Sequence, residues 1–342
     1  MIKSNATLKK RGRNPLDAFD RPNPFQQRVA PLSQDSHTSS QRLSSEKIDE
    51  IPRKPPEKHP TTTKQIVQPV GHQQSSIALS PRLQEDLSHL RNMLLSQSDD
   101  LNIDGPLTSK LVDACCDSDA TAETALQLVG CDQASDAALH VLADSFSQQG
   151  CVAHAASCFA RFALFPRLLK LHQPASRPLV NALLALRSHQ ASALLNQVML
   201  PLFWSFSDLD SEKVNARVEV LGRVVKGLPQ YKLPLFVHGA LLGQGERTCV
   251  WTESQATVLQ LVLACRPILN DECVLTILQQ ADANAGALRR SLKFSNLVFT
   301  LVRVYGPQLT PHVGAARSLA AQLDTFMRKT ALAAVNKITE KI

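Results

Sequence analysis

The sequence has little glycine, no long hydrophobic run and no close pair of cysteines. Thirteen glycines among 342 residues is about half of the usual ~7% share, which leaves little material for hairpin turns and disfavours a β-sheet protein. No apolar run approaches the roughly 18 residues that a membrane span needs, so no membrane association is expected. The eight cysteines contain no C-x-x-C pair. This indicates reduced, buried thiols in a reducing compartment and disfavours a disulfide or zinc framework.

Motifs that carry out chemistry are also missing. Gly243-Gln244-Gly245 lacks the third glycine of a dinucleotide fingerprint, and the sequence contains neither a P-loop nor a G-x-S-x-G elbow. His154 and Cys158 are one helical turn apart, but a closed metal site needs four ligands, so we interpret His154 as a packed or surface histidine. Cys115 and Cys116 have no evident activating neighbour. These observations predict a protein that is not an enzyme and has no cofactor, metal or small-molecule substrate.

The positive charge is concentrated in the first 80 residues. They contain 13 basic and 7 acidic residues, whereas residues 81–342 contain 24 basic and 23 acidic residues. This distribution argues against a folded domain with a broad cationic nucleic-acid face. Residues 1–78 also hold nine of the twenty prolines and show no apolar periodicity. We therefore predict a disordered basic, Pro/Ser-rich tail over residues 1–79 and a folded domain over residues 80–342.

Apolar residues recur at helical spacing throughout the second region. Three stripes show the pattern: Ala191, Leu194, Leu195, Val198 and Leu202; Val258, Leu261, Val262 and Cys265; and Phe294, Leu297, Val298, Leu301, Val302 and Tyr305. Helix starts are expected at Thr252, which begins a capping box, at Asn270, and at Thr310 before Pro311. The pattern predicts an all-α protein of eleven to thirteen helices, arranged as an α-solenoid of divergent helical hairpins. In this interpretation Leu261 belongs to the core, and its replacement by alanine should cost about 2–5 kcal/mol.

The tail contains short segments with possible binding functions. Lys9, Lys10, Arg11 and Arg13 form a basic cluster that suits a nuclear-import signal or a weak contact with DNA phosphates, and equally a solvated charge run. Residues 14–25 are a candidate partner-docking segment, and they end in the Asn-Pro-Phe tripeptide that endocytic adaptor domains recognise. Ser33 and Ser40 each precede glutamine, the context that DNA-damage kinases prefer, although chance explains such dipeptides equally well.

Four stretches of the helical region, taken in order, resemble one known family. They are Phe165 to Leu171 with Pro174 to Val180, then Val250-Trp251-Thr252-Glu253, then Ser291 to Tyr305, and finally Thr325-Phe326-Met327-Arg328-Lys329-Thr330 through Ala334. Their order resembles that of the C-terminal helical domain of the Fanconi anaemia group E (FANCE) family, with the best match over residues 160–335. Met327 and Thr330 stand where the family usually has Leu and Ser, and the methionine conserves volume and apolarity.

The resemblance implies a function as well as a HEAT-like helical-repeat fold. Family members are non-catalytic adaptors of the nuclear Fanconi anaemia core complex, the ubiquitin ligase assembly of DNA interstrand crosslink repair. They join the group C and group F proteins and hold the group D substrate, and the terminal Phe-Leu step has been assigned to that last contact. Carried over to this sequence, the resemblance points to Phe326 and Met327, with Arg328 and Lys329 as a cationic rim.

The residues themselves leave the role of this step open. On a helix with Leu319, Leu323, Met327, Ala331 and Ala334 facing the core, Phe326 lies about 100° round from Met327, so we expect one of the two to point outward. The alternative is that both belong to the core. At the level of function, the alternative is a generic helical-repeat adaptor, for example in membrane traffic through Asn23-Pro24-Phe25.

Overall fold

The computed structural model describes residues 79–96, 105–206, 211–242 and 250–340. The chain divides into two units, residues 1–71 and 72–342. The first unit lies outside the described residues, and so does the predicted disordered tail as far as residue 78. The described part of the second unit begins with Leu79, which is buried, and Ser80, whose hydroxyl accepts a hydrogen bond from the Leu83 amide at the start of the first helix.

The described residues are helical throughout and contain no strand, so the predicted all-α class is confirmed. The α-helices are α1 (Pro81–Leu95), α2 (Gly105–Asp117), α3 (Asp119–Val129), α4 (Asp136–Phe146), α5 (Ala153–Phe159), α6 (Phe165–Leu169), α7 (Arg177–Ala185), α8 (Ala191–Leu194), α9 (Leu200–Trp204), α10 (Ser211–Gly227), α11 (Leu233–Leu242), α12 (Glu253–Ala264), α13 (Asp271–Leu288), α14 (Leu292–Tyr305), α15 (Val313–Gln322) and α16 (Met327–Thr339). Short π-helical segments join α5 to α6 and α8 to α9. With each joined pair taken as one helix, the described chain has fourteen, slightly more than the eleven to thirteen expected.

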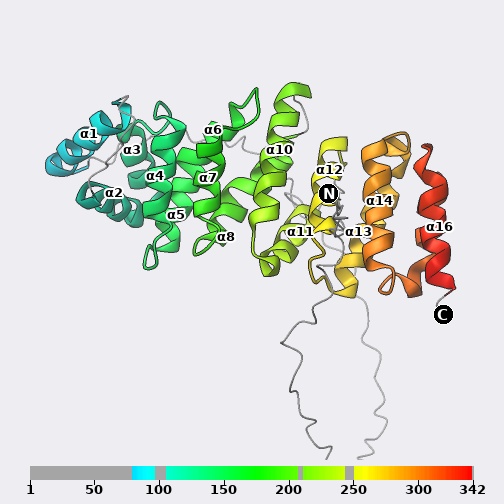
Figure 1. Cartoon of the computed structure of the whole chain (residues 1–342). Coiled ribbons are helices and arrows are strands. Elements are labelled where there is room, and N and C mark those ends of the chain that lie inside the picture. The colour runs from blue at the N-terminus through cyan, green and yellow to red at the C-terminus, as the bar shows by residue number, and fades with distance from the viewer. Residues whose placement is uncertain (1–78, 97–104, 207–210, 243–249, 341–342) are drawn as a thin grey trace, which may run out of the picture. The chain divides into compact units, whose positions relative to one another are not determined.

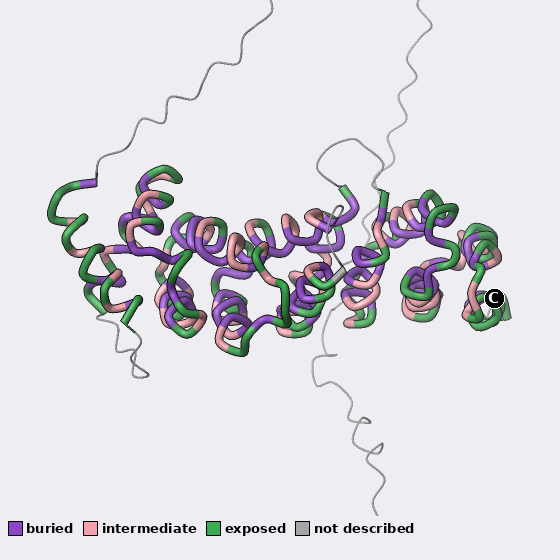
Figure 2. The backbone as a smooth tube through the Cα atoms, turned by 90° about the horizontal axis from the view of Figure 1, so that it is seen from above, coloured by how far each residue is buried: buried purple, intermediate pink, exposed green. Residues whose placement is uncertain are grey.

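Successive helices alternate between two layers. One layer contains α1, α3, α5–α6, α8–α9, α11, α13 and α15, and the other contains α2, α4, α7, α10, α12, α14 and α16; within each layer, neighbours in this order pack against each other. Figure 2 shows the two rows, with buried residues on their facing sides. This is the architecture of an α-solenoid built from helical hairpins, in which each hairpin buries its apolar face against the next.

Polar side chains fix many of the helix starts. Ser118, Ser135, Ser176 and Ser291 each accept a hydrogen bond from a backbone amide three residues further on, as helix N-caps do. The predicted caps are confirmed at Thr252, which forms a complete capping box with Gln255, and at Asn270. The prediction for Thr310 is wrong. Thr310 begins a 3₁₀ turn, and α15 starts only at Val313, without a side-chain cap.

Two prolines explain the π-helical segments. Pro166 and Pro201 lie inside helices, where a proline ring would clash with the carbonyl four residues earlier. In each case the wider π-turn immediately precedes the proline and accommodates it, at Ala160–Leu164 and Leu195–Met199. The two π-segments lie 35 residues apart and contact each other in the same layer. They therefore mark equivalent positions in two successive repeats.

A short sequence is also repeated in this layer. The tetrapeptide Leu-Pro-Leu-Phe occurs at residues 200–203 and again at residues 233–236. The two copies lie in α9 and α11, which are neighbours in one layer. Their phenylalanines, Phe203 and Phe236, are both fully buried and meet edge to face with ring centroids 5.7 Å apart. The repeat was not recognised in the sequence, and it places two aromatic rings at the centre of the stack.

The predicted helical stripes mostly form the core. Every residue of the stripes at 191–202 and 294–305 is buried. In the third stripe Val258 and Val262 are buried, but Leu261 and Cys265 are only half-buried. The prediction that Leu261 belongs to the core is therefore wrong. Helix α12 buries Leu259 and Leu263 instead.

The difference between two leucines of α12 can be measured. Leu259→Ala, at a site with 1% exposure, should lower the free energy of unfolding by about 2–5 kcal/mol. Leu261→Ala should cost only about 1–1.5 kcal/mol, because less apolar surface leaves water there. Urea unfolding followed by circular dichroism measures both values. Equal losses would mean that Leu261 is a core residue after all.

Candidate partner-binding surface

Phe326 lies at the turn between the last two helices and points into solvent. It is the residue before α16, makes no side-chain cap, and is 77% exposed. Met327 is half-buried, while Arg328 and Lys329 are exposed. The helix assumed to run from 319 to 334 is broken, because α15 ends at Gln322 and α16 begins at Met327. Phe326 is thus the residue of the Phe-Met step that points outward, as was expected of one of the two, whereas Met327 is only half-buried.

Hydrogen bonds and an ion pair join the turn between α13 and α14 to the turn that contains Phe326. The amide of Asp324 donates a hydrogen bond to the carbonyl of Arg289 at 2.8 Å, and the hydroxyls of Ser295 and Thr325 lie 2.9 Å apart. The side chain of Arg290 pairs with Asp324 at 3.3 Å. The turn between α13 and α14 is therefore held beside the turn between α15 and α16, and the residues of both turns share one surface. We call residues 289–293 and 324–329 together the Phe326 surface.

The Phe326 surface is strongly basic. Asp324 is its one acidic residue. Its five basic residues are all exposed, and they are Arg289, Arg290, Lys293, Arg328 and Lys329. Residues 81–342 as a whole have only one more basic residue than acidic ones, so this excess of four is local. Leu292, at 43% exposed, adds a second apolar side chain. An exposed aromatic residue with a cationic rim is an arrangement that suits a protein interface, where aromatics and arginine dominate binding energy.

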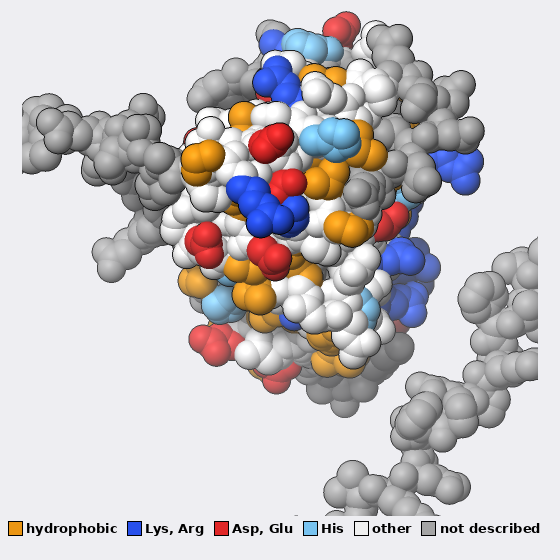
Figure 3. Space-filling model, turned by 90° about the vertical axis from the view of Figure 1, so that its left-hand side faces the viewer, with side chains coloured by type: hydrophobic (Ala, Val, Ile, Leu, Met, Phe, Trp, Pro, Cys, Tyr) orange, Lys and Arg blue, Asp and Glu red, His pale blue; other side chains and the backbone are white. Residues whose placement is uncertain are grey.

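The opposite end of the array has a different character. Figure 3 looks onto the α1 end, where acidic, basic and histidine side chains are interspersed with separate hydrophobic ones. No single sign of charge gathers on that face. The Phe326 surface therefore differs from the α1 end, because it combines an exposed aromatic ring with an excess of basic residues.

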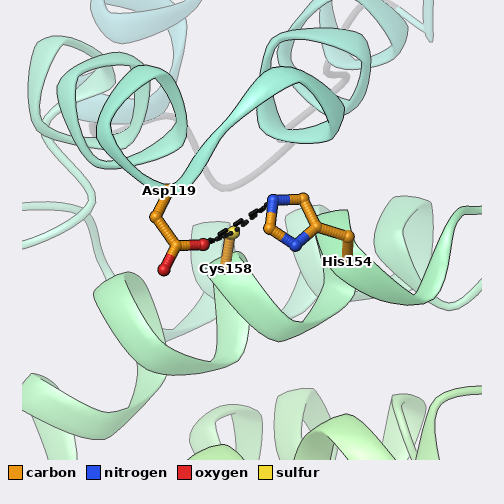
Figure 4. Close-up of side chains that lie close together, drawn as sticks. All are labelled: Asp119, His154 and Cys158. Carbon is orange, nitrogen blue, oxygen red and sulfur yellow. Dashed lines mark hydrogen bonds and ion pairs between the residues drawn. The ribbon is translucent and has the colours of Figure 1, made fainter.

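The structure brings a third residue to His154 and Cys158. Both lie on α5, and Asp119, the first residue of α3, approaches them so that its carboxylate, the imidazole and the thiol face one another (Figure 4). Nothing in the sequence links Asp119 to the other two. Burial and the neighbouring carboxylate raise the pKa of the Cys158 thiol to about 12, so the thiol is protonated at neutral pH in the absence of a cation.

The other cysteines that the structure describes show no sign of activation. Burial raises the pKa of the Cys115 and Cys116 thiols, and that of Cys131 to about 12. A reactive cysteine needs the opposite shift, because the thiolate is the nucleophile. These thiols pack within the apolar interior or at its edge.

Some sequence-predicted residues fall outside the described part. They are the basic cluster Lys9, Lys10, Arg11 and Arg13, the segment 14–25, and the serines Ser33 and Ser40. The sequence analysis missed Arg289, Arg290 and Lys293 as parts of a surface. Their closeness in sequence, directly before and inside the first turn of a predicted helix, was the available signal.

No protein-family model matches the sequence, and no curated protein does so either. Among the described residues, no helix is both long and apolar enough to cross a membrane.

Proposed function

We propose that the chain is a non-catalytic adaptor of the nuclear Fanconi anaemia core complex, linking the ubiquitin ligase assembly to its group D substrate in interstrand crosslink repair. The observation that carries the proposal is the exposure of Phe326 within a basic rim, at the step where the resemblance to the FANCE family implies substrate contact. The two-layer helical stack supports it, because repeat arrays offer extended surfaces for several partners.

The chemistry of the Phe326 surface indicates the kind of partner that fits it. Five exposed cations on the same surface as one exposed aromatic ring suit an acidic patch with an apolar cleft that receives the ring. In this proposal the group D protein supplies that patch. The group C and group F proteins bind elsewhere on the stack, and the basic tail residues Lys9, Lys10, Arg11 and Arg13 direct the protein to the nucleus.

Substitution of Phe326 tests the role of the surface. Phe326→Asp should weaken capture of the purified group D homologue at least about tenfold, because an aromatic hot spot contributes about 2 kcal/mol or more to binding. The free energy of unfolding should change by less than about 0.5 kcal/mol, because the ring is already in solvent. Pull-down at several partner concentrations and urea unfolding give the two values. Arg289→Glu combined with Arg290→Glu should weaken binding as well, and more so at low salt.

Ile268 provides the matched control. It is 85% exposed and lies in the turn between α12 and α13, at the other end of the hairpins. Ile268→Asp introduces the same charge on an equally exposed apolar residue and should leave capture unchanged. If Phe326→Asp lowers binding only as far as Ile268→Asp does, or if it unfolds the protein, Phe326 is not the anchor.

Cellular location and co-purification test the wider assignment. A tagged chain should be nuclear, and the group C and group F homologues should co-purify with it from nuclear extract. A punctate cortical signal, lost on mutation of Asn23-Pro24-Phe25, would instead support the adaptor of membrane traffic.

A further inference from the structure

Three potential metal ligands converge between α3 and α5. His154 and Cys158 are four residues apart on α5, so both side chains leave the same face of that helix. Asp119 reaches them from the first turn of α3 (Figure 4). The Cys158 Sγ lies 3.5 Å from Asp119 Oδ1 and 3.6 Å from His154 Nε2, and the same Nε2 and Oδ1 atoms lie 3.6 Å apart. The three ligand atoms thus form a nearly equilateral triangle.

The edges of this triangle match those of a tetrahedral zinc site. Zinc binds sulfur at about 2.3 Å, imidazole nitrogen at about 2.0–2.1 Å and carboxylate oxygen at about 2.0–2.2 Å, which at tetrahedral angles separates the ligand atoms by about 3.3–3.6 Å. The His154–Asp119 contact is longer than the roughly 2.7–3.2 Å of an N–H···O hydrogen bond. Cys158 is within hydrogen-bonding distance of both residues, but its single S–H can donate to only one of them at a time. The three ligand atoms also face a common point at the separations that a zinc ion requires.

The surroundings of the cluster suit a cation. Arg161 pairs with the second carboxylate oxygen, Asp119 Oδ2, at 3.2 Å and leaves Oδ1 facing the thiol and the imidazole. Such an outer partner orients a metal-binding carboxylate. The side chains of Asp119 and His154 are 57% and 42% exposed, whereas Cys158 is only 2% exposed. A cation can enter from solvent and meet the thiol at the base of the site.

We propose that Asp119 Oδ1, His154 Nε2 and Cys158 Sγ bind one Zn²⁺ ion, with a water molecule as the fourth ligand. A mixed sulfur, nitrogen and oxygen set selects zinc over Mg²⁺ and Ca²⁺, which prefer oxygen ligands alone. Binding forms a bond from the Cys158 thiolate to zinc, and the thiol proton is released to solvent. The ion joins α3 to α5 across their shared layer, so this end of the stack is expected to become more stable when zinc is bound.

Cobalt(II) is the spectroscopic probe for the site. We expect the full chain, stripped of metal with a chelator, to bind one equivalent of Co²⁺ with a thiolate-to-cobalt charge-transfer band and the visible bands of a tetrahedral ion. Zinc should displace cobalt and abolish both. Residues 1–78 contain three histidines but no cysteine, so the tail cannot produce the charge-transfer band.

Substitutions identify the ligands. Cys158→Ser should abolish the charge-transfer band, and His154→Gln and Asp119→Asn should each weaken zinc binding at least about tenfold. Cys273→Ser and His140→Gln remove the same residue types from α13 and α4 and should have no effect. His154 is partly exposed, so His154→Gln remains informative even if Cys158→Ser fails to fold. Absence of the band in the unaltered protein, or a band and affinity that survive His154→Gln, would overturn the proposal.

Discussion

Phe203→Ala is expected to lower the free energy of unfolding by about 3–5 kcal/mol. Phe203 is fully buried in α9 and meets the rings of Trp204 and Phe236 edge to face, with centroids 5.0 and 5.7 Å away. Its carbonyl also accepts a hydrogen bond of 3.2 Å from the buried side chain of Gln255 on α12. Contacts from both layers hold the surroundings in place, so they cannot collapse into the space that the ring leaves.

Unfolding in urea, followed by circular dichroism, measures this loss. Tyr231→Ala is the matched control, because Tyr231 is also aromatic but 68% exposed, and its truncation should change stability by less than about 0.5 kcal/mol. A loss below about 1 kcal/mol at Phe203 would show that the stack repacks around the cavity. It would also show that the paired Leu-Pro-Leu-Phe segments are not a fixed point of the fold.

The fold was predictable from the sequence because its main determinants are local. The stripe from Phe294 to Tyr305 follows the 3.6-residue period over three turns, and every member is buried. The capping box at Thr252 and Gln255 depends on residues three apart, and it forms as expected. A solenoid stacks consecutive hairpins, so few distant contacts are needed to determine its class.

What the sequence did not reveal depends on contacts between distant segments. Arg289 and Arg290 join Phe326 only because the Asp324 amide binds the Arg289 carbonyl, 35 residues away. Asp119 similarly reaches Cys158 across 39 residues.

The burial of Leu261 was predicted wrongly for another reason. Helix α12 is apolar on several sides, so periodicity does not single out its buried face.

A buried arginine joins the two layers, and its removal should have the second large effect on stability. Arg217, on α10, is 4% exposed. Its guanidinium donates hydrogen bonds to the carbonyl of Leu169, the last residue of α6, and to the hydroxyl of Ser205, directly after α9, at 3.2 Å in the second case. Both acceptors lie at helix C-termini, where the helix dipole favours a positive charge. Burial lowers the pKa of Arg217, which reflects the cost of removing the charge from water.

Arg217→Met retains an unbranched apolar stem and removes only the guanidinium. We expect it to lower the free energy of unfolding by about 1–3 kcal/mol, because partly buried acceptors at two helix ends lose their donor. Arg223→Met is the control on the same helix. Arg223 is exposed and pairs with Glu219 one turn earlier, an interaction of about 0.3–0.5 kcal/mol. If Arg217→Met is as mild as Arg223→Met, or stabilises the protein, desolvation of the guanidinium outweighs its two hydrogen bonds, and Arg217 does not stabilise the contact between the layers.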